Sequence, residues 1–355
     1  MGQTFQLVAP RARMAVPWGG KLGEILFDGS AKDLVDLLAV PVRPSYLRRR
    51  SLEATVVPPT AGDDKADTNC SVTFSGLPTE VHRHIFAHVE SIKDAILFGL
   101  TSRYFWSIGR ERMHDIYLSL LGRWAGKNIV CVGEDVKPDD YPPGLFSAEE
   151  LDVLRKDWAD ICCSDYPDEE VPFPDEPLRL VHFTSPIWSE MVRPVSVRQE
   201  SLLIRGSDSV IDIISDPMYA SPRSELSVRD EHYFPEDQPW ILRNLTTKQF
   251  VRSEAIALTP RFIHGPHIEV LGFGEVVMSR ICWSTSSSVS MSDTTNISRG
   301  VWAGHRFDVT TLARHEDETR GVGWSDVSNE VAKEIADIWE SEYGANWREV
   351  ILGLV

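Results

Sequence analysis

The stretch from Leu77 to Trp106 constrains the fold of this chain most, because its spacing predicts short helices that follow one another closely. Pro78 suits the first turn of a helix, where its missing N–H and fixed φ cost nothing, and Glu80 adds a negative charge there. The apolar residues of this first helix fall on one face, and they are Val81, Ile85, Phe86 and Val89. The sequence therefore predicts an amphipathic helix of about three turns.

Two further helices are predicted directly after the first. Ser91 and Asp94 form an S-x-x-D arrangement that caps a second helix, which carries Leu97 and Leu100. A third helix is predicted from about Ser102 to Leu121. Three such helices contain more apolar residues than a unit of about 40 residues buries internally. We therefore expect part of the apolar surface to stay accessible, with these residues partly exposed: Leu77, Pro78, Ile85, Phe86 and Leu97.

The stretch resembles the F-box, the helical module that docks onto the Skp-type adaptor of cullin-RING ubiquitin ligases. The match covers about Phe74 to Arg110 and follows the patterns L-P-x-E, D-x-x-L-x-x-L and T-S-R-x-F-W. The resemblance implies that the adaptor binds these residues: Leu77, Pro78, Glu80, Val81, Ile85, Phe86, Leu97 and Leu100. The alternative is an internal helical hairpin whose apolar stripe is simply core. His84 and His88 have a spacing that can chelate a metal, but no third ligand is nearby, and we expect no metal site.

Composition limits the classes of partner. The 355-residue chain is 42% hydrophobic and 25% charged, which is typical of a soluble globular protein. Its formal net charge of −17 argues against nucleic acid or an anionic membrane as the main partner. The five cysteines form no C-x-x-C pair and there is no apolar run of membrane length, so we expect a cytoplasmic or nuclear protein.

The fold class expected is α+β, with a three-helix F-box-like unit inserted into or preceding a mainly antiparallel sheet domain with flanking helices. The predicted segments are an N-terminal hairpin and helix that belong to the sheet domain (1–50), a flexible linker (51–71), the F-box-like unit (72–122) and a C-terminal α+β domain (123–355) with an acidic loop (164–177). We expect segments 51–70, 164–177 and 285–298 to be mobile, because they have little apolar area to bury.

Secondary structure outside the F-box-like unit is predicted from pattern and turn signals. The strands expected are a hairpin over Phe5–Val16 that ends in a bend at Trp18, a strand at 128–132, a hairpin over 240–252, and strands at 268–271, 275–283 and 300–312. The helices expected run from Ser30 to Leu38, from Ser147 to about Ile161 and from about Asp326 to Tyr343.

Several motifs resemble a family of fungal F-box-containing proteins of unassigned activity. The motifs are K-L-G-E at Lys21–Glu24, W-x-L-R-N-L-T-x-K at Trp240–Lys248, R-I-C-W-S at Arg280–Ser284 and R-G-V-W-A-G-x-R-F-D at Arg299–Asp308. This resemblance spans nearly the whole chain. It implies that the F-box-like helices are inserted into a sheet-containing domain, and it supplies no catalytic residues.

No recognised catalytic or phosphate-binding motif occurs, so we expect a non-catalytic ligase subunit with no cofactor and no metal. Its expected partners are a Skp-type adaptor and an unknown protein substrate held by the C-terminal domain. Two alternatives remain. One is a scaffold protein without ligase function. The other is an enzyme with an unrecognised site in the C-terminal domain, among His264, His267, His305, Asp308 and nearby tryptophans.

Overall fold

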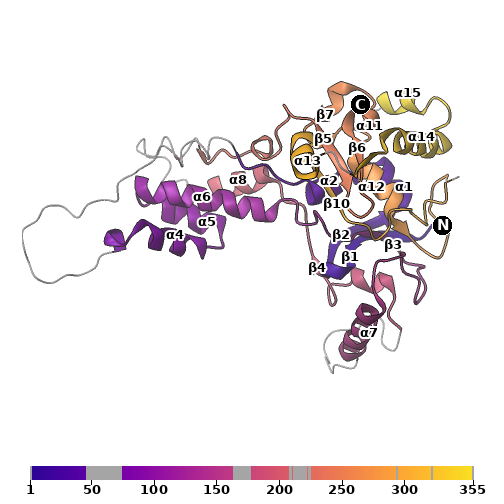
Figure 1. Ribbon diagram of the computed structural model, residues 1–355, viewed down its shortest axis with the longest axis horizontal. Coiled ribbons are helices and arrows are strands. Elements are labelled where there is room, and N and C mark those ends of the chain that lie inside the picture. Colours follow the sequence, from indigo (N-terminus) through magenta and orange to yellow (C-terminus); the bar gives the residue numbers. More distant parts are fainter. Residues whose placement is uncertain are drawn as a thin grey trace, which may run out of the picture. The chain divides into compact units, whose positions relative to one another are not determined.

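The computed structural model describes residues 2–44, 74–162, 177–207, 225–292, 295–320 and 323–353, together with 210 and 222. The chain divides into two compact units (Figure 1). The sheet unit contains 1–40, 124–194 and 236–355, and the helical unit contains 41–123 and 195–235. Helices and open, mixed sheets confirm the α+β class. The predicted linker and almost all of the predicted acidic loop lie outside the described residues.

A five-stranded sheet has the N-terminal hairpin at its centre. Its order is β4-β2-β1-β3-β9. The strands are β1 (Thr4–Ala9), β2 (Met14–Lys21), β3 (Val130–Gly133), β4 (Glu190–Met191) and β9 (Cys282–Trp283). In the antiparallel pairs Val8 lies opposite Ala15 and Leu7 opposite Cys131, and all four side chains are fully buried. The first residues of the chain thus form the core of the sheet unit.

A second sheet has the order β10-β5-β6-β11. Its strands are β5 (Trp240–Asn244), β6 (Gln249–Arg252), β10 (Phe307–Thr311) and β11 (Ser325–Asp326), and a separate small hairpin consists of β7 (Ile263–His264) and β8 (His267–Ile268). The predicted hairpin over 240–252 is confirmed, with Leu242 opposite Val251. Most of the longer pairings in both sheets are antiparallel.

Helices surround these sheets in the sheet unit (Figure 1). They are α1 (Leu22–Phe27), α2 (Lys32–Leu38), α7 (Ala148–Cys162), α11 (Ser253–Ile256), α12 (Phe273–Ile281), α13 (Leu312–Thr319), α14 (Ser328–Tyr343) and α15 (Trp347–Leu352). Ser147 caps α7 as expected: its hydroxyl accepts from the Glu150 N–H, and the Glu150 carboxylate accepts from the Ser147 N–H. The other predicted helices are also present, although α2 begins two residues after Ser30.

Three of the predicted strand assignments were wrong. The segment 275–283 is mostly the helix α12, the pairing expected at 268–271 stops at Ile268, and the strand expected at 300–312 is limited to Phe307–Thr311. Every residue of α12 is buried, including Glu275 and Arg280. A helix with no solvent face shows no 3.6-residue periodicity, so its β-branched run had the pattern of a buried strand. A bend was expected at Trp18, but this residue lies inside the strand β2.

The helical unit contains the three predicted short helices and an additional segment. Its helices within the described residues include α4 (Thr79–Ala87), α5 (Ile92–Gly99), α6 (Arg103–Leu120) and α8 (Val197–Arg205). The hydroxyls of Ser91 and Ser102 accept hydrogen bonds from the N–H groups of Asp94 and Phe105, which explains where α5 and α6 begin. The segment 195–235 belongs to this unit, whereas the sequence-based boundaries had put it in the C-terminal domain.

Candidate functional site

Helix α4 divides its side chains between an interior and an exposed side. His82 and Phe86, four residues apart, are buried. Val81 and Ile85 are also four residues apart and lie on a different side, where Val81 is 39% exposed and Ile85 is half-buried. Leu77, two residues before α4 begins, is half-buried as well. We call Leu77, Pro78, Val81 and Ile85 the α4 apolar face. Each of the four keeps part of its surface accessible.

Phe86 anchors α4 to the rest of the helical unit. Its ring stacks on Phe98 of α5, with centroids 4.4 Å apart and an interplanar angle of 7°. Around this pair lies a cluster with Tyr104, Phe105 and Ile108 of α6. Phe86 is only 1% exposed. The expectation that it lies on an accessible surface was wrong, because α6 contributes an aromatic wall that the spacing of α4 alone does not reveal.

His82 fixes the start of α4. Its Nδ1 lies 2.9 Å from the Tyr104 hydroxyl and its Nε2 lies 2.8 Å from the Phe74 carbonyl oxygen. The Tyr104 hydroxyl oxygen also lies 3.1 Å from the Thr79 hydroxyl oxygen. These bonds satisfy a buried imidazole and hold the chain ahead of α4 against α6. Phe74 remains 39% exposed, although its ring centroid lies 5.0 Å from that of His82 and 5.2 Å from that of Phe105.

The remaining residues that the F-box resemblance assigned to the adaptor differ in exposure. Glu80 is exposed, and Leu97 of α5 is half-buried. Leu100 is only 2% exposed, so its side chain serves the interior of the unit. The structure therefore leaves six of the eight assigned residues partly or fully accessible: Leu77, Pro78, Glu80, Val81, Ile85 and Leu97.

The segment 195–235 is tied to α6 by polar contacts that sequence reasoning did not find. One carboxylate oxygen of Glu225 accepts from the Trp106 Nε1 at 2.9 Å and from the Arg110 guanidinium at 3.2 Å. His114 Nδ1 lies 2.6 Å from the Tyr233 hydroxyl. Burial, followed by the positive charge of Arg110, lowers the pKa of His114 to about 3, so this imidazole is neutral at physiological pH. Trp106, a residue of the F-box-like pattern, therefore donates its indole hydrogen bond to Glu225 of the same chain.

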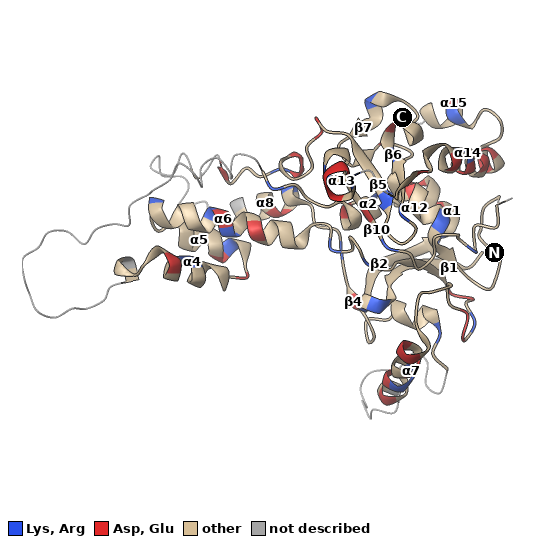
Figure 2. Ribbon diagram, in the orientation of Figure 1, with Lys and Arg blue, Asp and Glu red and all other residues tan. Residues whose placement is uncertain are grey.

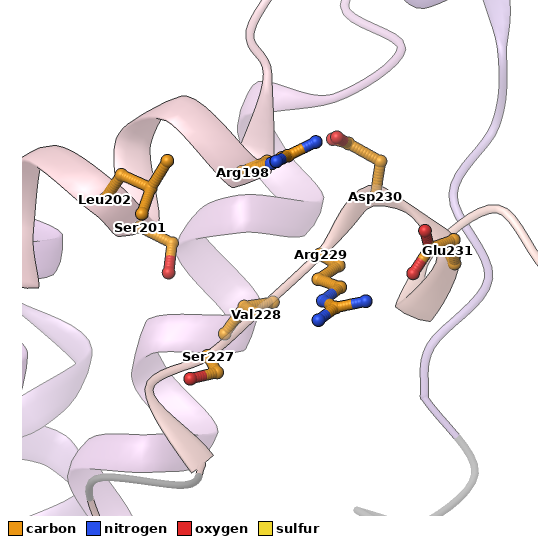
Figure 3. Close-up of a pocket in the computed structure, with 8 residues that line it drawn as sticks. All are labelled: Arg198, Ser201, Leu202, Ser227, Val228, Arg229, Asp230 and Glu231. Carbon is orange, nitrogen blue, oxygen red and sulfur yellow. The ribbon is translucent and has the colours of Figure 1, made fainter.

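A polar pocket of about 350 Å³ lies between α8 and the segment that precedes the short 3₁₀ turn at Asp230–His232 (Figure 3). Eight residues line it: Arg198, Ser201, Leu202, Ser227, Val228, Arg229, Asp230 and Glu231. The Asp230 carboxylate accepts from the Val197 N–H at 2.9 Å, and the Ser201 hydroxyl donates to the Leu226 carbonyl oxygen at 2.8 Å. The lining contains two arginines and two carboxylates, so it has no dominant charge.

The residues of the enzyme alternative have separate structural partners. Arg243 donates to both carboxylate oxygens of Asp308, each at 2.7 Å, and His305 Nδ1 lies 2.9 Å from the Asn244 amide nitrogen. His264 Nε2 lies 3.3 Å from a Glu269 carboxylate oxygen. Of the candidate tryptophans, Trp240 and Trp339 are almost fully buried and belong to the core.

Some of the described helices carry mostly acidic side chains. An example is α14, which bears Glu330, Glu334, Asp337 and Glu340 (Figure 2). Within the part of the chain that the structure covers, no helix combines the length and apolar character that a bilayer crossing requires.

Comparison with known proteins gives no matching family model, no similar curated protein and no similar solved structure.

Proposed function

We propose that this protein is a substrate-recruiting subunit of a cullin-RING ubiquitin ligase, with the helical unit as the part that binds the Skp-type adaptor. The observation that carries the proposal is the α4 apolar face. Val81 and Ile85 retain accessible apolar surface on a helix that already buries His82 and Phe86 on its interior side, and Leu77 does so just ahead of that helix. An apolar stripe beyond what the core uses is typical of a protein-binding helix.

In this proposal the sheet unit holds the substrate and supplies no covalent chemistry. An adaptor of this kind acts by raising the effective concentration of its substrate at the ligase. Such a role would place the protein in the cytoplasm or the nucleus, where cullin-RING ligases act. The competing proposal is a scaffold protein in which α4, α5 and α6 serve only as a structural core. In that case the protein does not bind the adaptor, and substitutions on α4 have no effect on adaptor binding.

The decisive experiment compares two sets of variants in binding to a purified Skp-type adaptor. Leu77→Ala combined with Val81→Ala removes two partly exposed anchors, each worth about 1 to 3 kcal/mol of binding. We expect at least about a tenfold weaker Kd by titration calorimetry, with little change in the thermal melt. Phe86→Ala should instead destabilise the protein by about 3 to 5 kcal/mol, because it empties part of the aromatic cluster.

The matched control is Val153→Lys, which changes an equally apolar side chain on α7 that is 60% exposed. This variant should bind the adaptor as the unchanged chain does. Absence of any binding by the unchanged chain would contradict the proposal, as would a double variant that loses stability but no affinity. Either result would favour the scaffold reading.

A further inference from the structure

His84 and His88 lie one helical turn apart on the exposed side of α4. Their Nε2 atoms are 3.4 Å apart, and both side chains are exposed. His88 is the C-terminal cap of the helix, but its φ of −87° and ψ of −3° keep it in the right-handed helical region. The i, i+4 relationship between the two rings therefore continues to the end of α4.

The separation of the two nitrogens matches the bite of a tetrahedral metal ion. Zinc binds imidazole nitrogen at about 2.0 to 2.1 Å, and a tetrahedral angle between two such bonds separates the nitrogens by about 3.3 Å. No metal site was expected from the sequence, although the spacing can chelate a metal, because no third ligand is nearby. The structure adds that the two Nε2 atoms lie within hydrogen-bond distance of each other, with the rings edge to face, so one ion that replaces this contact can reach both nitrogens.

The described part of the chain contains no group of three or more His, Cys, Asp or Glu side chains placed to hold a metal. A site on α4 would thus have two protein ligands, and the other coordination positions would be open to water or to donor atoms of another molecule. Because both side chains are exposed, an ion in solution can reach the two nitrogens. The formal net charge of −17 also favours cations near the protein surface.

We propose that His84 and His88 form a surface site for a divalent first-row transition-metal ion, with zinc as the representative ion. Imidazole ligands suit Zn²⁺, Cu²⁺ and Ni²⁺ and discriminate against Mg²⁺ and Ca²⁺, which prefer oxygen. The site does not depend on the proposed adaptor, because zinc itself is the ligand that is measured.

The test is a zinc titration of the full chain by calorimetry at neutral pH, with cobalt absorption as a second readout. We expect the unchanged chain to bind one equivalent of Zn²⁺ that His84→Ala and His88→Ala each weaken by at least about tenfold, since removal of an outer-shell partner alone costs 10- to 100-fold. The same equivalent should raise the melting temperature of the unchanged chain and leave that of His84→Ala combined with His88→Ala unmoved.

The control is His264→Ala combined with His267→Ala, which removes another close histidine pair whose rings face Glu269 and Asp36. This control should keep the equivalent that the α4 variants lose. Three results would overturn the proposal: no saturable zinc binding by the unchanged chain, retention of the equivalent in the α4 double variant, or its loss in the control. Circular dichroism of each variant without metal separates ligand loss from misfolding.

Discussion

Glu275 is a carboxyl group that the fold encloses completely. Its side chain is 3% exposed and accepts a hydrogen bond from the Gly272 N–H at 2.8 Å, which helps to start α12. Burial raises the pKa of Glu275 from 4.5 to about 7, while the hydrogen bonds and the nearby positive charge of Lys32 oppose that change. The helix start therefore depends on a group that titrates near physiological pH.

This environment predicts how stability depends on pH. A carboxyl with a higher pKa in the folded chain than in the unfolded chain holds its proton more tightly when folded, so the free energy of unfolding falls as pH rises from about 4.5 to about 7. The loss is on the order of 3 kcal/mol. Glu275→Gln keeps the acceptor oxygen and removes the titration, so its urea-unfolding free energy should be flatter across this range.

Glu254→Gln on α11 provides the comparison, because it removes an exposed carboxyl from the same unit. Its pH profile should follow that of the unchanged chain. A Glu275→Gln profile as steep as that of the unchanged protein would contradict the assignment of this titration to Glu275.

Helices α5 and α6 pack at a distance that only glycine permits. A Cβ added at Gly109 would lie 2.7 Å from the Ala95 carbonyl oxygen and 2.9 Å from the Gly99 Cα. Both neighbours are backbone atoms, so neither can rotate away. The close approach brings α6 near enough to α5 for Phe105 to reach Phe98, with ring centroids 5.6 Å apart.

Gly109→Ala should destabilise the protein although alanine is the better helix former. Intrinsic propensity favours alanine by about 1 kcal/mol, but overpacking against backbone costs about 1 to 3 kcal/mol. Chemical denaturation should therefore show a net loss. Ser119→Ala on the exposed side of α6 lacks this contact and should be neutral or slightly stabilising. A Gly109→Ala variant more stable than the unchanged chain would show that the two helices are free to separate.

At the scale of the whole molecule, neither of the two units is one continuous stretch of the chain. Three segments of the sheet unit alternate with two segments of the helical unit. The central strand β1 pairs with β2 by a short connection and with β3, more than a hundred residues further along. The sheet unit thus cannot complete its five-stranded sheet until distant parts of the chain have met.

Deletion of residues 2–21 should abolish the sheet unit, because it removes β1 and β2 from the middle of that sheet. We expect the loss of a cooperative thermal transition and of the near-ultraviolet circular dichroism of the buried tryptophans. Ser325→Ala on the two-residue edge strand β11 should leave both signals intact. A truncated chain with a native near-ultraviolet spectrum would contradict a central role for β1.

The sequence by itself determined the elements whose causes are local. The capping serines Ser91, Ser102 and Ser147 locate the starts of α5, α6 and α7, because a cap joins residues only three positions apart. The N-terminal hairpin and the hairpin over 240–252 follow likewise from alternation and turn residues. The α+β class needs no more than these elements.

Only the tertiary structure decided which apolar residues remain accessible. Phe86 and Val81 belong to one predicted stripe, yet the first is buried by the aromatic residues of α6 and the second is exposed. Tertiary structure likewise decided that α12 is a helix and that residues 195–235 belong to the helical unit. Burial depends on partners far away in the chain, and one sequence shows the apolar character of a residue but not which surface will cover it.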